Sequence, residues 1–145
     1  MILVDANLLI YAQIDSFPHH HQSRVWLDTC LGGHGRVGMP WSSLLAFLRV
    51  VTNPRIVAPP VSTAEACACV TEWLANEVVW TPQPTIQHAE ILTRLVKGAG
   101  AYGNLIPDAH LAALAIEHGL TLYSADADFA RFEGLRWINP IVSSP

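Results

Sequence analysis

Four aspartates lie where a divalent cation could bind. Asp5 directly follows a short apolar run that predicts a buried strand, and Asp126 comes shortly after a second such run. Ligands of open α/β sheets bind at the carboxyl ends of the strands, so we expect both side chains at one edge of a sheet. Asp108 falls in the first turn of a predicted helix, and Asp128 could add a further oxygen. Such hard oxygen donors suit Mg²⁺ or Mn²⁺, which also bind phosphate oxygens.

Each of these aspartates also has a simpler explanation. An aspartate in the first turn of a helix ordinarily caps it, and one after a strand ordinarily forms a turn. Asp5 is the hardest to explain in this way. A carboxylate that ends an apolar strand is partly buried and needs a charged or hydrogen-bonding partner. The prediction of a metal site therefore depends on the set and not on any one residue.

Short strands that alternate with helices position these residues. Apolar runs predict strands over residues 2–4, 37–39, 78–80, 121–123 and 136–138. Periodic apolar positions predict helices over about 7–12, 19–27, 43–51, 62–75, 85–97 and 107–118. The alternation indicates an α/β fold of three layers, α/β/α, around a short and mostly parallel central sheet. At 145 residues, the chain is expected to form a single domain over 1–145.

The composition is that of a folded, mildly acidic protein. It is 51% hydrophobic and 14% charged, with a net charge of −4. This charge argues against nucleic-acid binding through a broad basic face, although a metal-binding carboxylate cluster contributes to it. Seven of the eight basic residues are arginine, which suits phosphate contacts. The odd number of cysteines and the lack of a long apolar segment predict a cytoplasmic protein without a membrane anchor.

Three segments carry the acidic residues in a characteristic order. They are residues 4–11 (VDANLLIY), 105–115 (LIPDAHLAALA) and 122–129 (LYSADADF). With these segments the chain resembles the PIN-domain nucleases and, within them, the VapC toxins of bacterial toxin–antitoxin pairs. The similarity spans the whole chain. It implies a PIN-like fold and a metal-dependent endoribonuclease that hydrolyses RNA phosphodiesters.

The resemblance also implies a catalytic set of four aspartates: Asp5, Asp108, Asp126 and Asp128. The first three of these would bind Mg²⁺ or Mn²⁺. Asn7 and Ser124 would hydrogen-bond the carboxylates and fix their orientation. The partners implied are an RNA substrate, a cognate VapB-type antitoxin and a second copy of the chain in a homodimer.

One position departs from the family pattern. The family usually has a glutamate in the helix after the second strand, and the matching residue here is Phe47. No acidic residue lies between Asp28 and Glu65. This difference predicts fewer direct metal ligands. Arg49, two residues further on, could contact RNA phosphate or the antitoxin.

Two alternative functions fit parts of the pattern. A catalytically weak PIN module would bind RNA or an antitoxin without cutting, and the missing glutamate favours it. A phosphatase of the haloacid dehalogenase type also begins with a strand that ends in aspartate. Such an enzyme needs a second aspartate two residues later, where this chain has Asn7, and a downstream lysine, for which only the helical Lys97 is available. The phosphatase is therefore disfavoured.

Overall fold

The computed structural model describes residues 1–141, so the last four residues of the predicted 1–145 domain lie outside it. Within this range the strands form one sheet with the order β3-β2-β1-β4-β5. The strands are β1 (Ile2–Val4), β2 (Val37–Gly38), β3 (Val79–Trp80), β4 (Thr121–Tyr123) and β5 (Trp137–Ile138). Every pairing between neighbouring strands is parallel, which confirms the predicted sheet.

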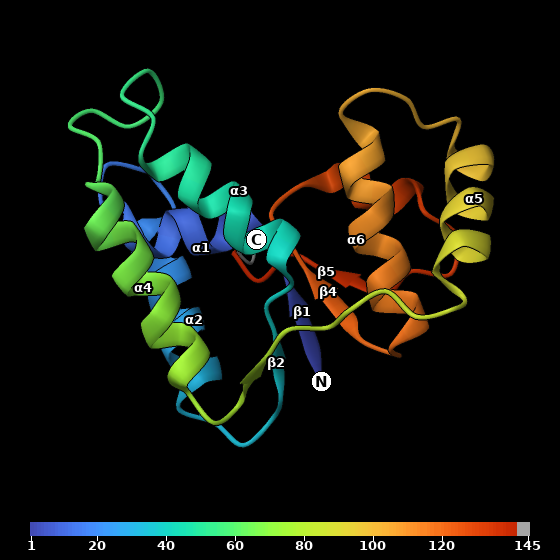
Figure 1. Ribbon diagram of the computed structural model, residues 1–145, viewed down its shortest axis with the longest axis horizontal. Coiled ribbons are helices and arrows are strands. Elements are labelled where there is room, and N and C mark those ends of the chain that lie inside the picture. The colour runs from blue at the N-terminus through green and yellow to red at the C-terminus, as the bar shows by residue number, and fades with distance from the viewer. Residues whose placement is uncertain (142–145) are drawn as a thin grey trace.

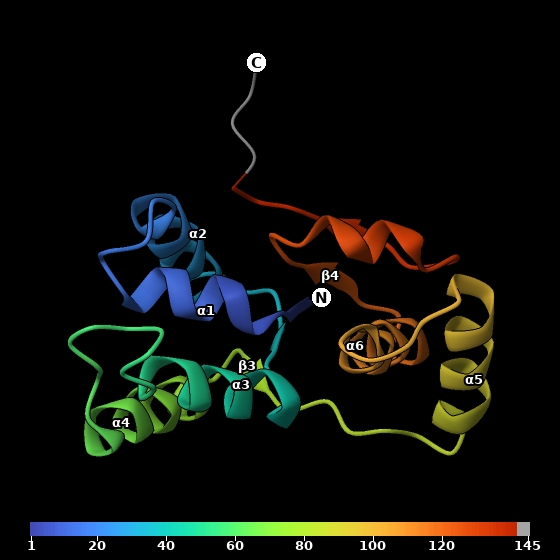
Figure 2. The same cartoon turned by 90° about the horizontal axis from the view of Figure 1, so that it is seen from above.

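Helices connect the strands and cover both faces of the sheet. They are α1 (Ala6–Gln13), α2 (His20–Leu31), α3 (Trp41–Val51), α4 (Thr63–Ala75), α5 (His88–Ala99), α6 (Leu105–Glu117) and the short 3₁₀ helix η1 (Ala127–Arg131). Figure 1 shows α1 to α4 to the left of the sheet and α5 and α6 to the right, and Figure 2 shows the same division from above. None of the helices in residues 1–141 is long and apolar enough to cross a bilayer.

Alternating side chains of β1 explain the two helical layers. Val4 is fully buried among apolar residues of α1 to α4, whereas Leu3 is fully buried among residues of α5 and α6. Successive side chains of a strand point to opposite faces, so one short strand anchors both layers. The predicted three-layer α/β/α fold is therefore confirmed.

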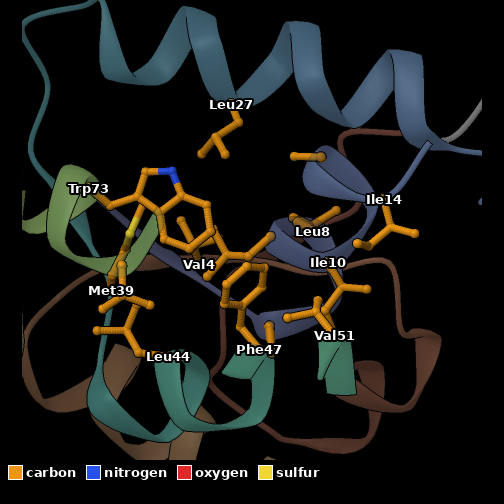
Figure 3. Close-up of a cluster of buried hydrophobic side chains, with 14 of the residues drawn as sticks. Val4, Leu8, Ile10, Ile14, Leu27, Met39, Leu44, Phe47, Val51 and Trp73 are labelled. Atoms are coloured by element: carbon orange, nitrogen blue, oxygen red, sulfur yellow. The ribbon is translucent and has the colours of Figure 1, made fainter. Parts of the chain in front are cut away.

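The larger hydrophobic cluster fixes the orientation of α3 (Figure 3). Phe47 is 1% exposed, and its ring meets that of Trp73 from α4 edge-on, with centroids 4.8 Å apart. Burying an aromatic side chain of this size stabilises the fold by roughly 1.5–3 kcal/mol. Because Phe47 points into this cluster, the side chain of its neighbour Ala46 lies on another side of α3.

Two helix starts lie close to the end of β1. Helix α1 begins at Ala6, one residue before the predicted start, and Asp5 caps it. Helix α3 begins at Trp41, directly after Pro40 and two residues before the predicted start, and the Ser43 side chain does not cap it. The Ser43 hydroxyl instead donates a hydrogen bond of 2.8 Å to the Val4 carbonyl oxygen. This bond satisfies the carbonyl group at which β1 ends and joins α3 to the strand that presents Asp5.

Candidate active site

Asp5 lies at the carboxyl end of β1, where the chain turns into α1. Its Oδ1 accepts a hydrogen bond of 2.7 Å from the Ala6 amide, and its Oδ2 accepts one of 2.7 Å from the Ser124 hydroxyl. The register of the sheet pairs Val4 with Tyr123, so the residues that follow each strand are neighbours. Parallel pairing thus brings Asp5 and Ser124 together across more than a hundred residues of sequence.

Ser124 connects Asp5, which follows β1, to Asp126, which follows β4. Besides donating to Asp5, its fully buried hydroxyl accepts from the Asn7 side-chain amide at 3.1 Å and from the Asp126 backbone amide at 3.0 Å. Asn7 in turn accepts from the Ala125 amide at 3.3 Å. Ser124 therefore contacts a carboxylate as expected, whereas Asn7 reaches Ser124 and no carboxylate. Asn7 acts on Asp5 only through the hydroxyl that it orients.

Asp126 and Asp128 begin the short helix η1. The Asp126 carboxylate accepts from the Asp128 amide at 2.9 Å and so caps this helix. Asp128 forms an ion pair with Arg131, with 3.4 Å between carboxylate and guanidinium. Its side chain is 49% exposed. Asp128 is therefore placed near the other acids, but its charge already has a partner.

Asp108 and Asp5 face a common cavity of about 460 Å³. The cavity lies between the start of α1, helix α3 and the start of α6, and its polar lining includes Asp5, Ser42, Ser43, Arg49, Asn104 and Asp108. Asp126 and Asp128 are not part of this lining. Sequence reasoning identified Asp5, Asp108 and Arg49, but it missed Ser42, Ser43 and Asn104 as cavity residues. Their only sequence feature was helix-start chemistry, which does not distinguish a cap from a site.

The aspartates interact electrostatically. The pKa of Asp108 is raised to about 6, first by burial and then by the negative charges of Asp5, Asp126 and Asp128. Burial also raises the pKa of Asp5, and the hydrogen bonds from Ser124 and Ala6 oppose that rise. Four carboxylates thus contribute to one negative field. A cation is the group that such a field favours.

The donor set fits a hard divalent cation that keeps part of its water. Within residues 1–141, no three His, Cys, Asp or Glu side chains are grouped closely enough to hold one metal ion directly. Mg²⁺ is commonly bound through one or two carboxylates, with water in its other positions. The carboxylates of Asp5 and Asp108, which share the cavity, meet this requirement. The cavity lining contains neither cysteine nor histidine, which disfavours the softer metals that prefer sulfur or imidazole.

Helix α3 supplies no acid to the cavity. Phe47 was expected to stand in the place of the family's glutamate, but it points into the core, and Ala46 lines the cavity instead. Arg49, one helical turn further on, also lines the cavity. No carboxylate in the described part of the chain forms an ion pair with it. Its guanidinium is therefore available to an anionic ligand.

The raised pKa of Asp108 predicts a loss of stability as pH rises. The pKa of this aspartate is near 3.8 in the unfolded chain and about 6 in the folded one, so the folded state keeps the proton to a higher pH. The free energy of unfolding therefore decreases as the pH rises from about 3.8 to about 6. Because Asp108 is only partly buried, we expect a loss of about 1 kcal/mol instead of the full shift. In urea unfolding with EDTA, the loss between pH 4 and pH 7.5 should be about 1 kcal/mol larger in the wild type than in Asp108→Asn, because Asp5 contributes to the loss in both proteins. Equal losses in both proteins would assign the effect to other groups.

Sequence and structure comparisons agree with this geometry. The profile of the PIN domain family matches residues 2–135, and the chain belongs to this family. It is 45% identical over 140 residues to ribonuclease VapC37 of Mycobacterium tuberculosis, with 97% of each chain covered. It is 39% identical to ribonuclease VapC33 of the same organism, with 97% and 99% of the two chains covered. The resemblance to VapC proteins that the three acidic segments predicted is confirmed.

A solved structure shows the same fold at low sequence identity. The chain superimposes on VapBC2 from Rickettsia felis, bound to a DNA fragment from its promoter, with a TM-score of 0.68. The sequence identity is 18%, and the match covers 96% of this chain and 98% of the other. The two chains thus share their fold although few of their residues are identical.

Proposed function

We propose that this chain is a metal-dependent endoribonuclease and the toxin of a VapBC-type toxin–antitoxin pair. The observation that supports it best is that Asp5 and Asp108 face one open cavity, where burial and then the charges of Asp5, Asp126 and Asp128 raise the pKa of Asp108. The VapC relatives are named ribonucleases and match the chain over nearly its full length. Together, the site and these relatives favour hydrolysis of RNA phosphodiesters over the phosphatase alternative.

The residues of the chain have distinct parts in this proposal. Asp5 and Asp108 would bind Mg²⁺ or Mn²⁺ directly, Asp126 would contact the ion through a coordinated water, and Asp128 would add negative charge beside them. When bound, the divalent ion neutralises charge on the reacting phosphate and lowers the pKa of a coordinated water. Ser124 and the Ala6 amide hold the Asp5 carboxylate in one orientation, which is the arrangement that preorganised catalysis needs.

Helix α3, which supplies no acid to the cavity, would contact the substrate. Arg49 would bind a phosphate oxygen of the RNA, because it lines the cavity and guanidinium groups suit phosphate. Asp126 would orient the attacking water. Attack of this water on phosphorus with loss of the 3′ oxygen leaves a 5′-phosphate and a 3′-hydroxyl. A 2′,3′-cyclic phosphate would show instead that the RNA's own 2′-hydroxyl attacks.

A PIN module that binds without cutting is the second candidate. It is favoured by the wall of α3, which presents Ala46 to the cavity and no acid. Fewer carboxylates give a weaker metal site and a slower reaction. In this version the cavity would serve mainly to bind RNA or an antitoxin.

The protein partners follow from the same negative field. We propose a VapB-type antitoxin that inserts a cation, such as an arginine, among the acids and so blocks the cavity. We also propose a homodimer as the form in solution. Replacement of every arginine of the cognate antitoxin should relieve inhibition, and unchanged inhibition would contradict the electrostatic version.

Cleavage of a fluorescent RNA with Mn²⁺ tests the proposed function. The wild type should cut, and Asp108→Asn should be slower by at least about 10²-fold, because it loses a charge that favours the metal. Asp15→Asn is the matched control, since this aspartate is exposed on a turn outside the cavity. Cleavage by wild type and Asp108→Asn at the same rate would remove the metal-nuclease proposal. RNA binding without any cleavage would favour the second candidate.

A further inference from the structure

Helix α3 exposes two large apolar side chains beside the acidic cavity. Trp41 is the first residue of α3 and is 44% exposed, and Leu45, one turn later, is 58% exposed. The residues that follow each of them, Ser42 and Ala46, line the cavity. Trp41 and Leu45 therefore form an apolar strip along the solvent side of the α3 wall. A tryptophan in a core helix is ordinarily covered, so this exposure needs a reason.

The opposite wall presents a second exposed ring. Tyr102 is 81% exposed and lies two residues before Asn104, which lines the cavity at the start of α6. Gly100 and Gly103 on either side of it have positive φ values of 61° and 57°. Glycine adopts this conformation at little cost, and Tyr102 lies between the two glycines in the short loop that joins α5 to α6.

Electrostatics alone gives RNA little affinity for this cavity. Its lining includes the acids Asp5 and Asp108 and a single arginine, Arg49, and the chain carries a net charge of −4. Most proteins that bind nucleic acid draw much of their affinity from many phosphate contacts with Lys and Arg. A base stacked on an aromatic side chain contributes about 1–3 kcal/mol and needs no positive charge.

We propose that Trp41 and Tyr102 are substrate-positioning residues that stack unpaired bases on the two sides of a phosphate held in the cavity. The ligand is then a segment of RNA with unpaired nucleotides, because paired bases do not expose their faces. Leu45 adds apolar contact beside Trp41. This inference rests on the proposed function, and it assigns affinity for RNA to the two rings and the chemistry to the acids.

The test measures binding separately from cleavage. The Asp108→Asn protein, which should bind without cutting efficiently, is titrated into a short fluorescein-labelled single-stranded RNA and followed by anisotropy. Adding Trp41→Ala or Tyr102→Ala should raise Kd by about 5- to 150-fold, the loss expected for one stacked base. Trp41→Phe should restore most of the affinity. The dependence of Kd on salt should keep its slope, because no phosphate contact is removed.

Controls separate stacking from general loss of apolar surface. Ile86 is fully exposed and does not line the cavity, so Ile86→Ala should leave Kd unchanged. A duplex of the same sequence should bind more weakly than the single strand. Sedimentation of each variant checks whether the rings belong to a contact between protein copies.

Three results would overturn the inference. The first is a Kd within twofold of the background for both Trp41→Ala and Tyr102→Ala. The second is a loss of binding that accompanies a change in oligomeric state, which would make the rings a protein contact surface. The third is no RNA binding by the background protein. The proposed function is tested separately, by RNA cleavage with the wild type. A failure of the stacking proposal in these binding experiments would not change the result of that cleavage assay.

Discussion

Replacing Asp5 with asparagine is expected to lower the rate of RNA cleavage by about 10³-fold, which corresponds to roughly 4 kcal/mol of transition-state stabilisation. The substitution removes the negative charge that lies deepest in the cluster. It preserves the fold, because the side-chain oxygen of asparagine can still accept from the Ala6 amide and cap α1. Cleavage rates at saturating RNA and Mn²⁺ measure the effect.

A graded series makes this prediction sharper. Ser124→Ala keeps all the acids but removes the hydroxyl that orients Asp5, and we expect a smaller loss of about 10- to 100-fold. Asp15→Asn should cleave at the wild-type rate. A rate for Asp5→Asn within fivefold of the wild type would show that the carboxylate at the end of β1 has no part in the chemistry.

Replacing His88 with alanine is expected to destabilise the fold by roughly 1.5–3 kcal/mol, the range for a hydrogen bond to a charged group. His88 on α5 donates from Nδ1 to the Glu117 carboxylate of α6 at 2.8 Å, and the Glu117 side chain is completely buried. The other carboxylate oxygen accepts from the Thr85 amide at 2.9 Å. Without His88, the buried Glu117 carboxylate keeps the Thr85 amide as a hydrogen-bond donor and has His118 Nε2 only at 4.0 Å.

This network also involves the helix that carries Asp108. The Nε2 atom of His88 lies 3.0 Å from Nδ1 of His110, which is two residues after Asp108 in α6. Burial, and then the neighbouring His88, lower the pKa of His110, so this ring favours its neutral form. A neutral His110 can donate its Nδ1 proton to His88 and complete a chain from Glu117. The chain joins α5 to α6 beside the site but does not line its cavity.

Urea unfolding of a double-mutant cycle isolates this effect. The pair His88→Ala and Glu117→Gln should cost less together than the sum of the two single changes, because neutral glutamine no longer needs a charged or strongly donating partner. His21→Ala, on an exposed histidine of α2, is the control and should change stability by less than about 0.5 kcal/mol. Additive losses would contradict a coupled Glu117–His88 interaction.

The sequence predicted the architecture because its strands are short and strongly apolar. The alternation of strands and helices was sufficient for a parallel three-layer fold, and Asp5 could be placed because a polar residue ends an apolar strand. Asp108 could be placed in a first helical turn in the same way. These features are local, and local patterns of hydrophobicity and capping are what a single sequence expresses most directly.

The parts that could not be predicted depend on distant contacts or on helix rotation. Whether Phe47 or Ala46 faces the cavity is decided by the packing of Phe47 against Trp73, which no local pattern contains. Ser43 looks like a helix cap, and its bond to Val4 exists only because α3 crosses the end of β1. The Glu117–His88 pair joins residues 29 positions apart. In each case tertiary structure, and not propensity, assigns the partner.

The most direct test of the shared negative field is thermal unfolding at pH 7.5 with and without Mg²⁺ or Mn²⁺. In EDTA, Asp108→Asn should melt at a higher temperature than the wild type, because asparagine avoids the cost of burying a carboxylate charge and the repulsion from the other aspartates. Adding the divalent ion should raise the Tm of the wild type and of Asp15→Asn, since an ion that binds only the folded state stabilises it. It should leave Asp5→Asn and Asp108→Asn nearly unchanged. Equal stabilisation of all four proteins by the ion would contradict a metal site built from Asp5 and Asp108.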